Sequence, residues 1–372
     1  MKQKHVCILY PYNYLPYSPT VLNLYDELSR QFQVTIVCVN RHSQNEGGLD
    51  SRNIVQVSYE REALYKATRK LLRLLRLLGA PTPNSDVSLE RYLQFRATKR
   101  TIAKLKPDHV VAVDIIMLWI AQRILRRPVH LLSLELKSMK GIARVDQDLV
   151  DSVVIESRKR LTHIFGERAV RAFFVPVSPI YKPIKKPRTN KKSLLYCGSA
   201  TGPFGIYTCL HFLSRYPEFV LTTRGRMDQG TFQNIVMCYP RLLDENRLTI
   251  ESTYLPEEAM LDYISKFRIG FCFYDTRFDK IANFHFFNVT SQKLYRYFTG
   301  GVPVVANRLD GLKAVEEFEA GVLIEDMTPE SILEAIGRIE QDYDRYVENC
   351  FTAAKDLSFD RHVQPFVEYL DR

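Results

Sequence analysis

Three residues, Thr290, Ser291 and Lys293, have the types and spacing needed to hold a phosphate group. The surrounding pattern predicts a helix that begins at Thr290 or Ser291 and ends at the glycines Gly300 and Gly301, before a buried strand. A hydroxyl cap leaves backbone N–H groups at the first turn, where the helix dipole favours an anion. Lys293 adds a positive charge within that turn. The stretch therefore predicts an anion site, although an ordinary capped helix with a surface lysine has the same local pattern.

Two other stretches of the C-terminal half place residues suited to a phosphate at the ends of predicted strands. Gly198 and Ser199 belong to the sequence CGSATGPFG, which follows a strand and precedes a helix. Glycines there allow the backbone to approach a ligand closely, although the spacing matches neither a dinucleotide-binding fingerprint nor a P-loop. Arg224 ends the next predicted strand, where its guanidinium can clamp a diphosphate or simply be solvated.

Carboxylates close two predicted strands of the N-terminal half, at Asp114 and Glu135. Either could act as a general base or orient a substrate hydroxyl, and Asp114 is equally suited to capping the next helix. His285 lies in an aromatic loop before Thr290, where it can contact a ligand or simply pack. The triplet 146–148, Asp-Gln-Asp, has an Asp-x-Asp pattern that can bind a metal ion, but it does not end a hydrophobic strand. The sequence therefore predicts no metal site.

The elements that must position these residues alternate between strands and helices, which predicts an α/β protein with doubly wound parallel sheets. A first series of strands runs from 5–10 to 173–175, and a second runs from 193–197 to 322–324. Four prolines among lysines separate the two series and predict a linker. The predicted organisation is a Rossmann-like domain over 1–178, a basic Pro-rich linker over 179–192, a second Rossmann-like domain over 193–355, and a C-terminal helix over 356–372 that closes back toward the first domain.

Charge and composition limit the classes of protein to consider. The 372 residues carry a net charge of +10, with +12 in 1–178, +6 in 179–192 and −8 in 193–372. One basic and one acidic half predict an anionic partner on one side only, and the acidic half counts against nucleic acid. No apolar run approaches the roughly 20 residues that span a bilayer. Seven scattered cysteines and the absence of a signal-peptide pattern predict a cytoplasmic protein with reduced thiols.

The segment 64–78, LYKATRKLLRLLRLL, has leucines on one helical face and basic residues on the rest. No acidic residue interrupts it, a pattern typical of a helix that lies on an anionic membrane surface. A packed helix with a solvated basic face is the alternative. The charge division favours peripheral association with the inner membrane face.

The helix start and the strand after it also carry a family pattern. The residues SQKLYRY at 291–297 and GGVPVVA at 300–306 resemble the "SKLFEYLAxGxPVVA" signature of GT-B glycosyltransferases, the group 1 or family 4-like retaining nucleotide-sugar transferases. The stretches 253–270 and 314–324 resemble the segments that flank this signature, and 153–178 resembles the end of an acceptor domain.

By that resemblance, the C-terminal domain binds a nucleoside-diphosphate sugar without a metal ion or a further cofactor. Ser291 and Lys293 would hold the diphosphate together with the amides at Thr290, while Tyr254 and Leu255 would flank the base. The remaining donor contacts expected around this site come from Gly198, Ser199, Arg224, His285 and Asn288.

The sequence departs from the family at positions where chemistry is expected. Retaining members carry two glutamates eight residues apart, and here Asn288 and Arg296 occupy those positions. The first strand–helix loop has Pro16 to Pro19 where the family has paired glycines. The predicted function is transfer of a sugar to a glycan or lipid-linked acceptor, in cell-envelope polysaccharide or glycolipid biosynthesis. A nucleotide-sugar epimerase of the same fold and a catalytically silent scaffold are the alternatives.

Overall fold

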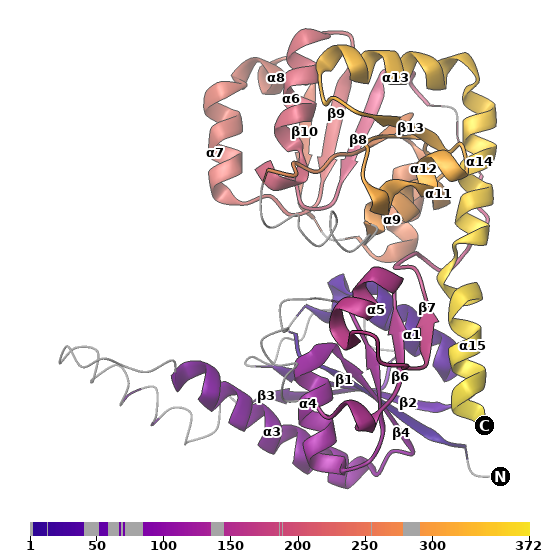
Figure 1. The fold of residues 1–372 in the computed structure, drawn as a ribbon. Helices are drawn as coiled ribbons and strands as arrows, with labels where there is room; N and C mark the ends of the chain where they lie inside the picture. The colour runs from indigo at the N-terminus through magenta and orange to yellow at the C-terminus, as the bar shows by residue number, and fades with distance from the viewer. Residues whose placement is uncertain are drawn as a thin grey trace. The chain divides into compact units, whose positions relative to one another are not determined.

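A computed structural model describes residues 3–12, 14–40, 52–58, 67, 70, 85–134, 145–185, 187, 189–253, 255–277 and 291–372. The chain forms two compact units, drawn in Figure 1. Unit 1 comprises Met1–Val175 together with Val363–Arg372, and unit 2 comprises Pro176–His362. The predicted membrane-surface helix, 64–78, lies outside the described residues apart from 67 and 70. No helix among the described residues is both long enough and apolar enough to span a bilayer.

Unit 1 is built on a seven-stranded parallel sheet with the strand order β3-β2-β1-β4-β5-β6-β7. Its strands are β1 (His5–Tyr10), β2 (Gln33–Asn40), β3 (Ile54–Ser58), β4 (His109–Val113), β5 (Val129–Leu132), β6 (Val150–Ile155) and β7 (Ala172–Phe174). The main helices are α1 (Pro19–Ser29), α3 (Ser85–Leu105), α4 (Asp114–Leu125) and α5 (Arg158–Phe165). All six residues of β1 are buried, as expected for a central strand that helices cover on both faces.

Unit 2 repeats this architecture with a six-stranded parallel sheet of order β10-β9-β8-β11-β12-β13. Its strands are β8 (Ser193–Cys197), β9 (Val220–Arg224), β10 (Leu248–Glu251), β11 (Ile269–Cys272), β12 (Val304–Asn307) and β13 (Gly321–Ile324). Its helices are α6 (Ile206–Arg215), α7 (Gln229–Cys238), α8 (Pro240–Asp244), α9 (Glu257–Ser265), α11 (Gln292–Thr299), α12 (Ala314–Glu317), α13 (Pro329–Gln341) and α14 (Tyr343–Asp356). The predicted α/β class with two doubly wound parallel sheets is therefore confirmed.

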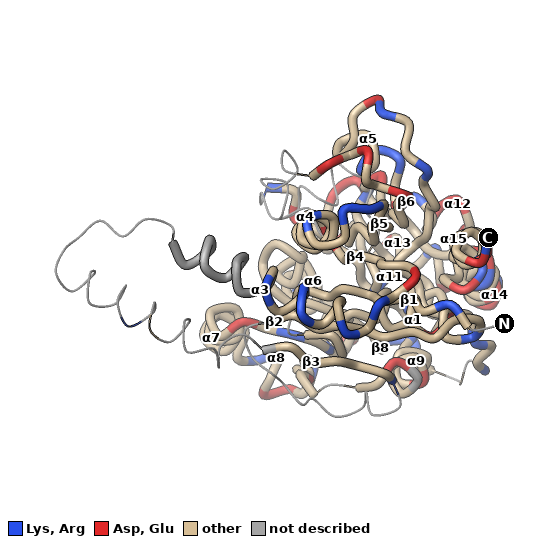
Figure 2. The backbone as a smooth tube through the Cα atoms, turned by 90° about the horizontal axis from the view of Figure 1, so that it is seen from below, with Lys and Arg blue, Asp and Glu red and all other residues tan. Residues whose placement is uncertain are grey.

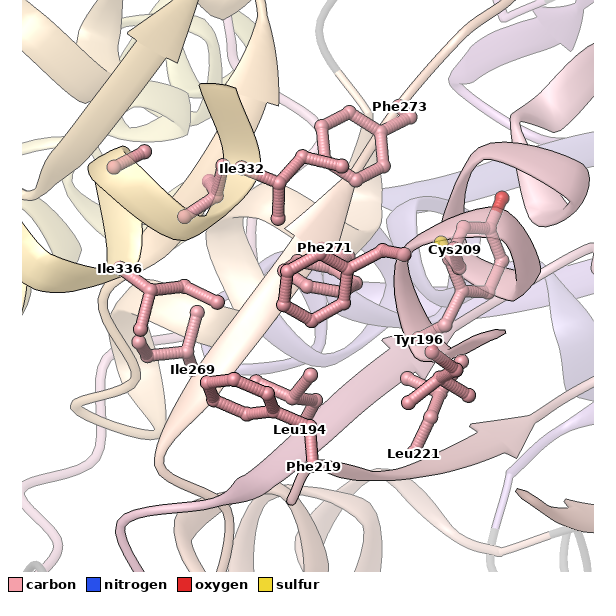
Figure 3. Close-up of a cluster of buried hydrophobic side chains, with 14 of the residues drawn as sticks. Leu194, Tyr196, Cys209, Phe219, Leu221, Ile269, Phe271, Phe273, Ile332 and Ile336 are labelled. Atoms are coloured by element: carbon pink, nitrogen blue, oxygen red, sulfur yellow. The ribbon is translucent and has the colours of Figure 1, made fainter. Parts of the chain in front are cut away.

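Apolar side chains on both faces hold the second sheet in place. Figure 3 shows one cluster, in which Leu194 and Phe271 from the sheet lie near Ile332 and Ile336 of α13. A second cluster includes Leu294 and Phe298 of α11 and fixes this helix against the other face. The two clusters together fix α13 and α11 on opposite faces of the sheet.

Each sheet contains one point where the direction of strand addition reverses. In unit 1, β1 pairs with β2 on one side and β4 on the other, and in unit 2, β8 pairs with β9 and β11. Loops from the two central strands leave in opposite directions at such a point, which opens a crevice beyond their carboxyl ends. These two topological switch points, called here the β1/β4 point and the β8/β11 point, are therefore the positions where a ligand is expected.

The last helix, α15 (Phe359–Asp371), begins in unit 2 and continues into unit 1. Phe366 and Leu370 are fully buried, and the Lys4 ammonium donates hydrogen bonds to the carbonyls of Leu370 and Asp371 at 3.1 and 2.7 Å. The C-terminal residues thus complete the first unit, as the prediction of a helix that closes back toward the first domain requires.

Candidate functional site

Helix α11 begins at the carboxyl edge of the second sheet with Ser291 as its cap. The Ser291 hydroxyl accepts a hydrogen bond from the Lys293 backbone N–H at 3.3 Å, and Ser291 itself has the extended backbone of a cap residue. Of the two predicted caps, Thr290 lies outside the described residues, as do His285 and Asn288. The helix therefore presents backbone N–H groups and its positive dipole end where the sequence predicts an anion.

Lys293 is buried in an aromatic setting beneath this helix start. Its ammonium donates to the Tyr196 hydroxyl at 2.9 Å and lies 4.2 and 4.6 Å from the ring centres of Tyr196 and Tyr274. Burial lowers the pKa of Lys293. Within the part of the chain that the structure describes, no carboxylate pairs with this ammonium. Contacts with two π faces offset part of the cost of burying the charge, and an anionic ligand would offset more.

Tyr196 connects Lys293 to the glycine-containing turn after β8. Its hydroxyl lies 3.2 Å from the Ser199 carbonyl oxygen and also contacts the carbonyl of Phe204. Lys293 and Ser199, which the sequence predicts as parts of one site, thus share a single hydroxyl as a neighbour. Tyr196 itself lies within a buried strand and showed no signal beyond strand propensity in the sequence.

The turn after β8 depends on glycine at Gly198, whose φ of 109° is unfavourable for other residues. No atom lies within 4 Å of the position that a Cβ would take there, so backbone conformation rather than space requires glycine. The turn after β9, which contains Gly225, packs directly against the turn after β8. A Cβ on Gly225 would meet the Gly198 carbonyl oxygen at 2.2 Å. The Gly198 N–H donates to the Arg224 carbonyl at 2.8 Å, which holds the two turns together.

The Arg224 side chain is engaged within the protein. Its guanidinium pairs with Glu251, donates to the Thr253 carbonyl at 3.1 Å and lies 4.3 Å from the centre of the Tyr263 ring. These contacts fix the turn that leads to Leu255, which is half-buried just before α9. Tyr254, the other predicted base contact, lies outside the described residues. Arg224 thus lies at the predicted edge of the sheet, with its charge already paired.

Arg296 occupies the position where the resembled family has a glutamate, and it also forms a close ion pair. Its guanidinium donates to the Glu257 carboxylate at 2.9 and 2.5 Å. This bidentate pair fastens α11 to the start of α9. The departure from the family at Arg296 is visible in the sequence, but no local pattern indicates that its partner is Glu257, 39 residues earlier.

Two further residues that sequence reasoning missed fix the backbone at this edge. The Tyr297 hydroxyl accepts from the Cys197 N–H at 2.7 Å and lies 3.2 Å from the Leu195 and Phe271 carbonyl oxygens, so α11 is tied to β8 and β11. The Asn307 side chain exchanges hydrogen bonds of 2.9 and 3.0 Å with the Tyr274 backbone. Both residues therefore hold the strand ends around Lys293 through hydrogen bonds.

In unit 1, Asp114 starts α4 directly after β4 with a left-handed backbone, φ 61°. It is buried, and one carboxylate oxygen accepts from the Leu134 N–H at 2.7 Å while the other accepts from the Tyr12 hydroxyl at 2.6 Å. The carboxylate thus ties together the loops that follow β1 and β5. Glu135, the second predicted carboxylate, lies outside the described residues.

The chain resembles several known proteins in its fold. No protein-family profile and no curated protein sequence matches the chain. Sucrose-phosphate synthase from Thermosynechococcus elongatus is similar in structure, with a TM-score of 0.68 at 14% identity over 99% of this chain and 98% of that one. Anabaena Alr3699/HepE gives a TM-score of 0.67 at 13% identity over 100% of both chains. The lipopolysaccharide outer core galactosyltransferase WaaB gives 0.57 at 14% identity over 98% and 99%. Because these similarities extend over both units, the chain has the two-domain GT-B fold.

Proposed function

We propose that this protein is a glycosyltransferase that moves a sugar from a nucleoside-diphosphate sugar to an acceptor hydroxyl. The observation that carries the proposal is the buried ammonium of Lys293 at the start of α11, next to the β8/β11 point of unit 2. A helix start, a glycine turn and a lysine without a carboxylate partner among the described residues form a site suited to a diphosphate.

The same groups suit the departure of a diphosphate from a sugar. Negative charge develops on the leaving diphosphate as the sugar–oxygen bond breaks, and fixed N–H dipoles and an ammonium in a site of low dielectric stabilise that charge. These groups supply the positive charge that a metal ion supplies in other transferases. We therefore propose that the reaction is metal-independent and requires no cofactor, since the nucleoside-diphosphate sugar is a substrate.

Uridine diphosphate is the first donor nucleotide to test. The HepE structure was determined with UDP and glucose, a trehalose-6-phosphate protein of Escherichia coli with UDP-2-fluoro glucose, and the pneumococcal O-GlcNAc transferase GtfA with UDP and GlcNAc. Each has a similar fold at 9–13% identity, so they supply candidates for the ligand. We propose a UDP-hexose donor and an acceptor in an envelope polysaccharide or glycolipid, reached from the cytoplasmic side of the membrane.

Thermal unfolding with a nucleotide panel tests the diphosphate site. At a concentration 100 times Kd, UDP should stabilise the protein by about 2.7 kcal/mol, and uridine without phosphates should stabilise it much less. Lys293→Met should abolish the UDP shift, because it removes the ammonium and retains an unbranched apolar chain. Excess EDTA should leave the shift unchanged.

Lys313→Met is the matched control, because Lys313 is an exposed lysine of the same unit that pairs with Glu317. Its UDP shift should equal that of the wild type. If UDP stabilises Lys293→Met as much as it stabilises the wild type, the diphosphate must bind at another site. If no nucleoside diphosphate stabilises the wild type, the proposed donor site is wrong.

A catalytically silent scaffold is the second candidate, favoured by one observation. Arg296 stands where a carboxylate is expected from the resemblance, and its charge is taken up by Glu257. Incubation with UDP-sugars and a mixture of envelope glycans separates the two candidates. UDP binding without release of UDP from any donor would support the scaffold.

A further inference from the structure

The Lys293 side chain has fewer hydrogen-bond acceptors around it than a buried ammonium needs. Only 6% of the residue is exposed, and among the described residues its nitrogen donates one hydrogen bond, to the Tyr196 hydroxyl at 2.9 Å. That hydroxyl donates its own proton to backbone carbonyls, so it acts toward Lys293 as an acceptor. An ammonium has three N–H groups, and a neutral amine has one fewer. The amine therefore leaves fewer buried donors without an acceptor.

The other groups around Lys293 supply no negative charge near neutral pH. The rings of Tyr196 and Tyr274 present their faces to it, and burial raises the pKa of both phenols well above 10. Burial also raises the pKa of the three neighbouring thiols, to about 11 for that of Cys272. These thiols are Cys197 of β8, Cys209 of α6, which Figure 3 shows with Tyr196, and Cys272 of β11. The ring faces favour a cation, but such contacts offset only part of the cost of burying a charge.

Lys293 also lies in the first turn of α11, at the end of a helix that disfavours a cation. Backbone N–H groups in that turn lack acceptors within the helix, and the helix dipole has its positive end there. Burial and the dipole therefore both favour an uncharged Lys293 in the ligand-free site. A diphosphate reverses the balance, because an anion beside the same groups favours the ammonium.

We propose that Lys293 is uncharged in the ligand-free site and that the diphosphate of the donor binds together with a proton. The proton comes from solvent, converts the Lys293 nitrogen into the ammonium of the donor site, and returns to solvent when the nucleoside diphosphate leaves. In agreement, burial lowers the pKa of Lys293 from its usual 10.5. The part played by the diphosphate rests on the proposed function, whereas the uncharged amine of the ligand-free site does not.

Proton uptake makes the affinity for the donor depend on pH. Between the pKa of Lys293 in the ligand-free protein and its higher pKa in the complex, the complex holds one proton more than the free protein. The Kd of the donor should therefore rise about tenfold per pH unit in that window. Below the window Lys293 is charged in both states, and it should make no contribution to the pH dependence of Kd.

NMR of the full-length protein, with isotope-labelled lysine observed at Cε, tests the first half of the proposal. The Lys293 signal is the one that disappears in Lys293→Met, and Lys293→Gln identifies it if that variant does not fold. In the ligand-free wild type, this signal should titrate at lower pH than the main group of lysine signals. Saturating UDP-glucose should move its titration to higher pH. Titration of the ligand-free Lys293 signal within the main group would overturn the proposal.

Isothermal titration calorimetry with UDP-glucose tests the second half. Both phosphates of UDP-glucose are esterified and keep their charges from pH 7.5 to 9.5, so a proton taken up on binding must be bound by the protein. Titrations in HEPES and in Tris, whose ionisation enthalpies differ, measure that uptake. It should reach up to one proton per UDP-glucose, and Kd should rise with pH. Lys313→Met removes an exposed lysine paired with Glu317 and should behave as the wild type.

The outcomes separate this inference from the proposed function. Binding of UDP-glucose without proton uptake, with a Kd that is constant over this pH range, would overturn the coupling and retain the donor site. If UDP-glucose binds and leaves the low titration of Lys293 unchanged, the diphosphate lies elsewhere, and both proposals are wrong. Absence of binding by every nucleoside diphosphate would remove the donor site and the coupling together, and would leave Lys293 a buried structural amine.

Discussion

At the residue scale, single side chains at the edge of the second sheet hold the groups of the proposed donor site in place. Lys293 is held by two tyrosine rings, and Tyr297 ties the same helix to two strands. None of these contacts involves an exposed surface pair, whose contribution would be small. Residues with a buried hydroxyl, such as Tyr297, are therefore the first ones to substitute in a test of stability.

Tyr297→Phe should lower the free energy of unfolding by about 1–3 kcal/mol, because it leaves the buried Cys197 N–H without its acceptor. Denaturant unfolding measures the change. Tyr207→Phe is the control, since the Tyr207 hydroxyl accepts an exposed hydrogen bond from Asn234, and it should change stability by less than about 0.5 kcal/mol. Equal effects of the two substitutions would contradict the role given to Tyr297.

The Asp114 carboxylate shows the limit of assigning chemistry to a residue from its position. As predicted, it lies at the end of a strand in unit 1, where functional groups gather. Its oxygens accept from Leu134 and Tyr12, which gives it a structural task. Action as a general base remains a prediction, to be tested by transfer kinetics of Asp114→Asn once an acceptor is known.

At the scale of the elements, helix α15 packs against a buried histidine of β5. His130 on β5 contacts His109 at 3.3 Å and Ser152 at 2.9 Å, and its ring lies against those of Phe366 and Tyr369 of α15. Burial lowers the pKa of His130 from 6.5 to about 4, with His109 and Arg127 acting in the same direction and Asp151 opposing them. The helix is therefore packed against a neutral imidazole.

A pH dependence follows from this packing. Because the folded pKa lies below the unfolded value of 6.5, His130 contributes full stability above pH 6.5 and loses it as the pH falls toward 4. The free energy of unfolding should fall by up to about 1.4 kcal/mol per pH unit in that window. His130→Gln should flatten this slope, measured by urea unfolding at pH 4.5 to 7, whereas His163→Gln, at an exposed position of α5, should not. An unchanged slope in His130→Gln would refute the assignment.

At the scale of the whole molecule, charge differs along the chain. Lys and Arg lie along α3 and after α4 in unit 1, as Figure 2 shows in blue, whereas 193–372 carry a net charge of −8. The basic segment most suited to a membrane surface, 64–78, lies outside the described residues. Peripheral membrane association therefore remains a prediction, to be measured by liposome flotation with neutral substitutions in that segment.

Removal of residues 363–372 should destabilise unit 1 and spare the donor site. The deletion removes four almost fully buried side chains, and the burial of each contributes about 1.5–3 kcal/mol to the free energy of unfolding. They are Val363, Phe366, Val367 and Leu370. Calorimetry should show a lower transition for unit 1 and an unchanged UDP-dependent shift. Phe366→Ala, expected to cost about 3–5 kcal/mol, serves if the deletion does not fold. Loss of the UDP shift in both variants would contradict the independence of the donor site.

The sequence by itself determined the features that depend on neighbouring residues. Strand–helix alternation predicted two parallel sheets, and the run from Ser291 to Gly301 predicted a capped helix followed by a buried strand, because periodicity, caps and glycine stops act within one or two turns. Both the fold class and the likeness to GT-B proteins were confirmed.

Only the tertiary structure decided the partners of the charged groups. Lys293 meets Tyr196 across 97 residues, Arg296 meets Glu257 across 39, and Asp114 meets Tyr12 across 102. No local pattern specifies such pairs, because they arise where the ends of different strands converge at one sheet edge. The sequence therefore predicted the place of the candidate site, and the fold determined which of its charges are already paired within the protein.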